Sequence, residues 1–148
     1  MLPWRVVQPH TEPIGLDVTR TGRVLSRAFN DALTAAGGSL PQWLVVMALK
    51  QGDHAMQRDL AASIGIEGAT LTHHLNRMEV EGLVRRERVA GNRRTQLVAL
   101  TPAGEELFGT LLGAVVSFDQ QLREGFSDRE LATVRSLLAR LRANTATS

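Results

Sequence analysis

Residues 56–100 carry the pattern that most constrains the fold of this 148-residue chain. A short helical segment, "MQRDLAASIG", ends in a glycine. A second one, "IEGATLTHHLNRMEVEG", opens with small and hydroxyl residues and also stops at a glycine. Two helices joined by a tight glycine turn predict a helix-turn-helix. Two strand-like runs, "LVRRERV" and "TQLVAL", follow at once and flank "AGNRR", which suits a tight hairpin turn. The order of these segments predicts a winged helix, in which the hairpin is the wing.

Long helical patterns precede this segment. Apolar residues recur at helical spacing from Ile14 to Ala36, where "AAGGS" ends the helix with glycine. Ser39 stands three residues before Gln42, with a proline between them, which is a capping-box arrangement. It opens the apolar helix "LPQWLVVMALK".

The C-terminal part of the chain predicts two further helices. Thr101 caps and Pro102 opens the first, whose apolar stripe is too long for a small core alone. Ser127 and Glu130 form a second predicted capping box, and the helix after it has a coiled-coil-like apolar spacing. Because the first helix and the last two carry excess apolar surface, the sequence predicts a homodimer built from both chain ends. The residues expected at its interface are Leu16, Leu111, Val115, Leu122, Leu131, Val134, Leu138 and Leu141.

Positive charge concentrates on the second short helix and the hairpin. Sixteen of the seventeen basic residues are arginine, which forks onto phosphate groups or a guanine edge. Residues 77–94 hold six of these arginines against three glutamates, a local net charge of +3 compared with +2 for the whole chain. A solvated basic face is the alternative, but a wing beside a helix-turn-helix favours nucleic acid. The six arginines are Arg77, Arg85, Arg86, Arg88, Arg93 and Arg94.

The residues expected to contact double-stranded DNA lie on that helix and on the hairpin. On the helix, polar side chains fall off the apolar face made by Leu71, Leu75 and Met78 and suit phosphate or base contacts. At the hairpin turn, Arg93 and Arg94 are placed to reach a narrow minor groove. The predicted DNA-binding residues are Thr70, Thr72, His73, Asn76, Arg77, Arg86, Arg88, Asn92, Arg93 and Arg94.

The predicted fold is therefore mainly α with a small β-hairpin wing, an α+β winged helix-turn-helix. We expect a single unit over residues 1–148, with dimerisation helices at 13–37 and 101–145 and a DNA-binding lobe at 39–100. No run of 18 apolar residues occurs, and the N-terminal segment lacks the apolar core and cleavage site of a signal peptide. We therefore expect a cytoplasmic protein without a membrane partner.

Other kinds of site find little support in the sequence. Without cysteine, the chain forms no disulfide, thiolate metal site or cysteine-based redox sensor. His73 and His74 are adjacent, and neighbouring helix residues diverge by about 100°, so they cannot chelate one metal ion. His74 instead falls on the buried face, where we expect a core histidine bonded to a carbonyl. We find no serine elbow or glycine-rich phosphate loop, and we expect no enzyme, no metal and no cofactor.

The segment "GNRRTQLVALTPAG" resembles the wing signature of the MarR (multiple antibiotic resistance regulator) family of winged-helix transcription factors. That signature has an acidic residue, two arginines, a valine two residues before a leucine–threonine pair, and a glycine. Residues 40–49 and 58–86 also follow the family's order and spacing, so the resemblance covers nearly the whole chain, from about Leu16 to Leu141. The matching positions in the signature are Asn92, Arg93, Arg94, Val98, Leu100, Thr101 and Gly104.

The chain departs from the family pattern at three places. Asn92 stands where the family usually has aspartate, so an ion pair there becomes a hydrogen bond. Met56 lacks the hydroxyl that usually caps its helix. Gly68 and Ala69 open the second short helix, which is the recognition helix of the motif, where the family more often has arginine or serine. The differences at Met56, Gly68 and Ala69 weaken helix ends and put the base contacts usual in the family in doubt.

The resemblance also implies two kinds of ligand contact. It implies that Arg94 inserts into the minor groove, with Arg93 or Arg88 as phosphate or internal partners. It further implies a pocket for a small aromatic acid where the dimerisation helices join the DNA-binding lobe. The alternative is that the residues of this pocket are ordinary core residues, because a sequence does not show cavities. The residues of this pocket are Arg23, Phe29, Trp43, Met47 and Phe108.

The residues and the resemblance together predict a homodimeric transcriptional regulator, and a repressor in particular, that binds a pseudo-palindromic operator. A small phenolic or aromatic acid would release it by stabilising a dimer whose half-site spacing no longer fits the DNA. The alternative is a winged-helix protein-interaction module without DNA binding. The only feature that favours it is the presence of Gly68 and Ala69 at the start of the recognition helix. Salt-dependent DNA binding separates the two.

Overall fold

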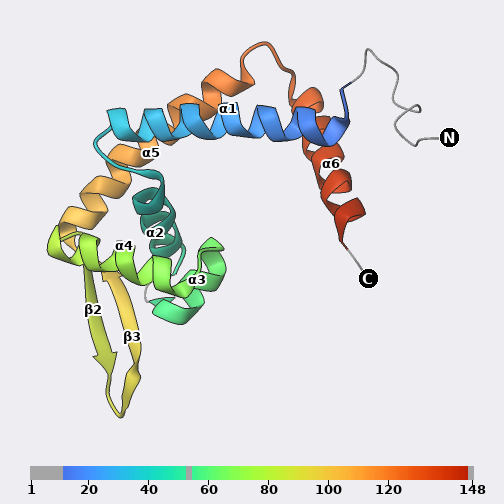
Figure 1. Cartoon of the computed structure of the whole chain (residues 1–148). Helices are drawn as coiled ribbons and strands as arrows, with labels where there is room; N and C mark the ends of the chain where they lie inside the picture. Colours follow the sequence, from blue (N-terminus) through green and yellow to red (C-terminus); the bar gives the residue numbers. More distant parts are fainter. Residues whose placement is uncertain (1–11, 53–54, 147–148) are drawn as a thin grey trace. The chain divides into compact units, whose positions relative to one another are not determined.

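The computed structural model describes residues 12–52 and 55–146, and within this range it leaves the side chains of residues 55 and 92–95 undescribed (Figure 1). The chain divides into two compact units, of which the first ends at Val115 and the second begins at Val116. The division falls inside one long helix, within the 101–145 region that the sequence assigns to dimerisation. Each unit is described by itself.

The fold is mainly helical with a small antiparallel sheet, as the sequence predicts. Helices begin and end close to the predicted glycine and capping positions. The elements are α1 (Ile14–Ala35), α2 (Leu40–Gln51), β1 (Ala55–Met56), α3 (Gln57–Ile64), α4 (Gly68–Val80), β2 (Val84–Val89), β3 (Asn92–Leu100), α5 (Pro102–Arg123) and α6 (Asp128–Thr145).

The sheet has three strands in the order β1-β3-β2, and all pairs are antiparallel. The strands β2 and β3 form the predicted hairpin, which Figure 1 shows projecting away from the helices of the first unit. Its turn falls at Gly91, where a φ of 84° favours glycine. The third strand, β1, pairs Met56 with Leu97. This two-residue strand was not predicted, because it is too short to show an alternating pattern.

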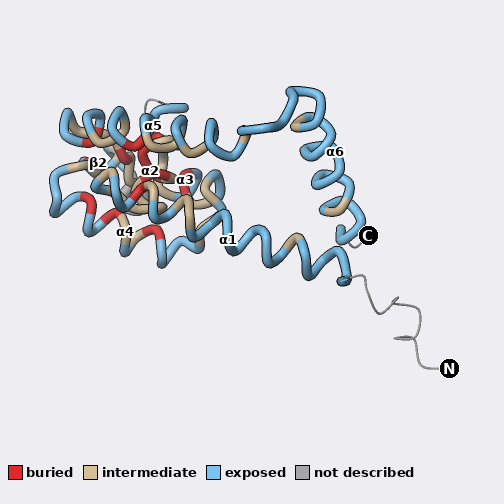
Figure 2. Tube along the Cα trace, turned by 90° about the horizontal axis from the view of Figure 1, so that it is seen from above, coloured by how far each residue is buried: buried red, intermediate tan, exposed pale blue. Residues whose placement is uncertain are grey.

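The core of the first unit lies among α2, α3, α4 and the base of the hairpin (Figure 2). Helix α2 is apolar on all sides because neighbours surround it, and α4 buries one face through Leu71, Leu75 and Met78. Leu111 of α5 is also fully buried, and its side chain packs so closely on Gly38 that a Cβ there would lie 2.6 Å from Leu111 Cδ2. This corrects the prediction for Leu111, which is a core residue of its own unit and not part of an exposed dimer surface.

Side-chain caps fix several of the helix ends. Ser39 Oγ accepts from the backbone N–H of Gln42 at 3.3 Å, but the Gln42 amide turns away and donates to Glu81, so only half of the predicted box forms. Ser127 and Glu130 form the complete reciprocal box at the start of α6, as predicted. Thr101 Oγ1 accepts from the N–H of the third residue of α5 at 3.1 Å, which confirms its capping role.

Much apolar surface stays exposed on the outer helices. In α1 only Leu33 is buried, while Leu16 and Val24 are exposed. Helix α6 buries no residue (Figure 2). Its Val134 and Leu138 are exposed. Leu122 is exposed too, whereas Val115, Leu131 and Leu141 are half-buried.

Within the described part of the chain, no single helix is both long and apolar enough to cross a membrane. Helices α1 and α2 meet that test only as a pair, on length and composition alone, and they are bent by 80° at the break between them.

Candidate nucleic-acid interface

The helices α3 and α4 form a helix-turn-helix whose turn is made by Gly65. This residue has a φ of 76°, and its N–H closes α3 by donating to the carbonyl of Ala61. The apolar face of α4 is buried, and most of its polar side chains lie on the opposite face. Thr70, His73, Asn76 and Arg77 are exposed, as the sequence predicts for residues that meet a ligand from solvent.

Thr72 differs from the other predicted contact residues of α4. It is half-buried, and its hydroxyl donates to the carbonyl of Gly68 at 3.0 Å. The same oxygen accepts from Gln57 Nε2 at 2.8 Å, which links α4 to the first residue of α3. Its hydroxyl therefore holds the two helices of the motif together.

Neither short helix has a side-chain cap at its start. Met56 is the N-cap of α3 and Glu67 that of α4, and neither side chain bonds a backbone N–H. Helix α3 therefore begins without a side-chain cap, as expected from methionine in place of a hydroxyl residue at position 56. The first N–H groups of α4 lack side-chain partners, and such groups favour anions.

The structure describes the side chains of three wing arginines, and two of them are exposed. Arg88 is exposed, and Arg85 is 61% exposed, with its Nε 2.9 Å from Oε1 of Glu87. The backbone places Arg93 and Arg94 in β3, just after the turn and not within it. Their side chains, and that of Asn92, lie outside the described part of the structure.

Arg86 alone among the described wing arginines turns toward the recognition helix. Its side chain is 15% exposed. Its Nε and Nη2 donate to the two carboxylate oxygens of Glu79 at 3.1 and 3.3 Å, and Nη2 also donates to Asn76 Oδ1 at 2.6 Å. The hydrogen bond from Arg86 holds the pKa of Glu79 below its usual value. Arg86 and Asn76 were both predicted to contact DNA, but in the structure they bond to each other.

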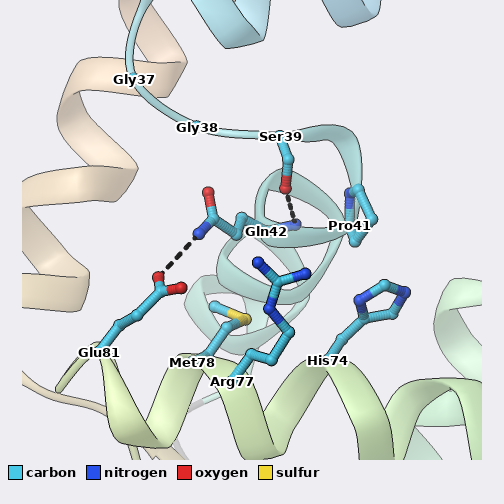
Figure 3. A pocket seen from close by; sticks show the side chains of 9 residues that line it. All are labelled: Gly37, Gly38, Ser39, Pro41, Gln42, His74, Arg77, Met78 and Glu81. Carbon is cyan, nitrogen blue, oxygen red and sulfur yellow. Dashed lines mark hydrogen bonds between the residues drawn. The ribbon is translucent and has the colours of Figure 1, made fainter.

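A cavity of about 440 Å³ opens between α4 and the turn that joins α1 to α2 (Figure 3). His74 and Arg77 point into it from α4, and Pro41 faces them from the start of α2. The other lining residues are Gly37, Gly38, Ser39, Gln42, Met78 and Glu81.

The position of His74 corrects its sequence interpretation. It is half-buried at the edge of this cavity and does not lie in the closed core. Partial burial lowers its pKa, and the nearby His73 and Arg77 lower it further. Folding therefore makes His74 harder to protonate than it is in the unfolded chain.

Of the five residues predicted to line an aromatic pocket, two are in ring contact with each other. Trp43 and Phe108 stack with their ring centroids 5.9 Å apart and their planes within 4°, and Lys50 Nζ lies 5.4 Å from the Phe108 centroid. Trp43 is buried, Phe29 and Met47 are half-buried against the core, and Arg23 is exposed on α1. None of the five predicted residues lines the cavity in Figure 3. Among the residues that the structure describes, no group of three or more histidine or acidic side chains is placed to hold a metal ion.

A helix-turn-helix followed directly by an arginine-bearing hairpin defines a winged-helix protein of the DNA-binding class. A sequence model described as the MarR family matches residues 39–95. The chain belongs to the MarR family, which comprises winged-helix DNA-binding transcription regulators.

Solved structures agree with this assignment. The transcriptional regulator PA3341 is 32% identical, with a TM-score of 0.74 over 89% of this chain and 97% of that one. NadR in complex with 4-hydroxyphenylacetate is 25% identical, with a TM-score of 0.68 over 91% of this chain and 96% of its own. A mutant MarR from E. coli complexed with operator DNA is 22% identical and shares the fold, with a TM-score of 0.78 over 87% and 93% of the two chains.

Proposed function

We propose that this protein is a cytoplasmic, homodimeric repressor that binds a pseudo-palindromic operator. The observation that carries the proposal is the division of α4 into two faces: one is buried through Leu71, Leu75 and Met78, and the other exposes polar side chains beside the wing. Such a helix suits the major groove, and arginines at the start of β3 suit the adjacent minor groove. Family membership and the DNA complex of the E. coli relative support this reading.

The proposed dimer uses the apolar side chains that each unit leaves exposed. Leu16 and Val24 of α1, and Val134 and Leu138 of α6, expose apolar surface to solvent. Pairing two copies through the chain ends would cover such surface and set two recognition helices about one DNA turn apart. Leu111 does not contribute, because it is buried within its own unit.

The proposal is tested by fluorescence anisotropy with DNA taken from upstream of the protein's own gene. Phosphate contacts by arginines should give an affinity that falls steeply with salt. Arg94→Ala should weaken binding about tenfold or more and reduce the salt slope by about one. The matched control is Arg140→Ala, which removes the same charge from α6 and should leave the affinity unchanged. Salt-insensitive or absent binding by the wild-type protein would favour the alternative, a protein-interaction module.

We further propose that a small phenolic or aromatic acid releases the protein from DNA. The support is the stacked Trp43–Phe108 pair with a lysine above it, together with the complex of NadR with 4-hydroxyphenylacetate. Titration with 4-hydroxyphenylacetate should change the tryptophan fluorescence, to which Trp43 contributes, and should lower the affinity for DNA. Calorimetric titration of the wild type and of two variants with the same acid, in the absence of DNA, locates the site. Loss of heat in Arg23→Ala supports the aromatic pocket, whereas loss only in Arg77→Ala moves the site to the cavity of Figure 3.

A further inference from the structure

The side chain of Arg86 faces inward because of strand geometry. Successive side chains of a strand point to opposite faces, so Arg86 shares the face of Val84, which is 2% exposed at the base of the hairpin. Arg85 lies between them on the other face and is exposed. Arg86 is also paired in register with the fully buried Val98 of β3. The backbone therefore directs its guanidinium toward α4 and away from solvent.

The recognition helix supplies a matching acceptor site. Asn76 and Glu79 are three residues apart and share one helix face. Three hydrogen bonds join this face to the single guanidinium, and two of them engage both carboxylate oxygens of Glu79. The bidentate geometry fixes the direction as well as the distance between the two groups. A lysine could not reproduce it, because its ammonium is a point charge without the planar fork.

We infer that Arg86 is a positioning residue that fixes the angle between the wing and the recognition helix, and that it reads DNA only through Asn76. This inference rests on the proposed DNA-binding function. Helix α4 and hairpin β2–β3 must enter two different grooves at once, so their relative angle decides whether both fit the same site. The three hydrogen bonds from Arg86 to Asn76 and Glu79, here called the tether, join these two elements directly.

The tether also decides what Asn76 presents to DNA. Because Oδ1 accepts from Arg86, the amide N–H groups of Asn76 are the part left for a ligand. The reverse amide orientation would face donors against the guanidinium donors. Asn76 thus offers donors toward purine N7, guanine O6, thymine O4 or a phosphate oxygen, and a paired donor–acceptor contact with adenine would have to use the second lone pair of Oδ1.

The experiment compares the affinity of the full-length protein for the upstream DNA and for an unrelated duplex of equal length, at several salt concentrations. We expect Arg86→Lys and Glu79→Gln each to lower the ratio of specific to unrelated affinity about tenfold. In Arg86→Lys, which keeps the charge, affinity for the unrelated duplex and the salt slope should stay as in the wild type, whereas Glu79→Gln, which removes a negative charge, should bind the unrelated duplex at least as tightly. The base preference under Asn76 should also broaden in Arg86→Lys.

The sign of the Glu79→Gln effect separates the inference from direct phosphate binding by Arg86. Removal of a negative charge near DNA should tighten binding to both duplexes if Arg86 simply contacts phosphate, and Arg86→Lys would then remain close to the wild type. The matched controls are Arg85→Lys and Glu87→Gln, which change an exposed pair on the same strand and should not lower the ratio.

The outcomes separate the inference from the proposed function. If the wild-type protein binds the upstream DNA specifically and Glu79→Gln keeps or raises the ratio of specific to unrelated affinity, the hydrogen bonds of Arg86 are not a positioning device and the proposed function stands. A lower melting temperature with an unchanged affinity ratio would reduce Arg86 to a stabilising contact. If the wild type binds neither duplex, the proposed function fails and the inference fails with it.

Discussion

The core of the first unit and the helix α6 of the second show opposite ways of using apolar residues. Helix α4 buries Leu71, Leu75 and Met78, each 2% exposed or less, against its own neighbours. Helix α6 carries a comparable apolar stripe and buries none of it fully: Leu131 and Leu141 are half-buried, Val134 is 43% exposed and Leu138 is 36% exposed. The first pattern is complete within one chain, whereas the second is not.

This difference shows that periodicity alone does not say what covers an apolar face. A helix gains most of its stability from tertiary packing of such a face, not from intrinsic propensity. The first unit obtains this packing from its own chain. Helix α6 has a complete capping box at its start but does not fully bury any of its apolar side chains. Substitutions on the two helices should therefore be felt in different measurements.

The largest effect is expected from Leu75→Ala in the core. Leu75 has no exposed area, so its truncation removes buried surface and leaves a cavity. The free energy of unfolding should fall by about 2–5 kcal/mol, which urea denaturation followed by circular dichroism measures. Val80→Ala, on the same helix at 89% exposure, is the control and should change stability by less than about 0.5 kcal/mol. Equal losses in the two variants would contradict the assignment of the core.

Local signals explain why much of this fold was predictable. Glycine at 65 and 91 and the caps at Thr101 and Ser127 act over a few residues, and the structure confirms each of them. The apolar face of α4 follows from helical spacing for the same reason. The division of α5 was not predictable. The burial of Leu111 depends on the close approach of Gly38, which is more than seventy residues away in sequence.

The candidate site was predictable in its residue types but not in their partners. The sequence placed positive charge on α4 and the hairpin, and the structure keeps Arg77, Arg85 and Arg88 exposed there. It could not show that Arg86 bonds Asn76 and Glu79, because that depends on which face of β2 meets which face of α4. The sequence offers one indication: Arg86 is two residues after the apolar Val84, so the two side chains lie on the same face of β2.

A second prediction concerns the exposed stripe of α6. Leu138→Asp places a charge on the surface proposed to pair two copies, where burying it would be costly. The dissociation constant of the dimer should rise about a hundredfold, equivalent to about 2.7 kcal/mol, as measured by sedimentation equilibrium. Circular dichroism should show that the helical content is kept. A dimer of unchanged affinity would mean that α6 does not form the interface, and a monomeric wild type would contradict the proposed assembly.

A smaller effect is expected where α5 begins against the base of the wing. A Cβ at Gly104 would lie 2.1 Å from the backbone oxygen of Leu83, the residue before β2, so Gly104→Ala must push the start of α5 away from the segment that leads into β2. Overpacking of this kind costs about 1–3 kcal/mol. Gly109→Ala, in the same helix, meets nothing within 4 Å and should instead stabilise by up to about 1 kcal/mol. Thermal unfolding of both variants measures the difference, and a shift in the same direction would contradict the close approach.

The smallest effect is expected from His74, which lies at the boundary between buried core and open cavity. Partial burial, His73 and Arg77 lower its pKa in the folded state, while the unfolded chain keeps the ordinary value of about 6.5. Below that value the unfolded state binds the proton more readily, so stability is fully present above about pH 6.5 and falls as the pH drops toward the folded-state pKa. Asparagine at this position does not titrate. The free energy of unfolding should therefore decrease more between pH 7.5 and pH 5.5 in the wild type than in His74→Asn. Parallel pH profiles would show that the cavity leaves His74 as well hydrated as in the unfolded chain, and would remove it from the buried side of the comparison.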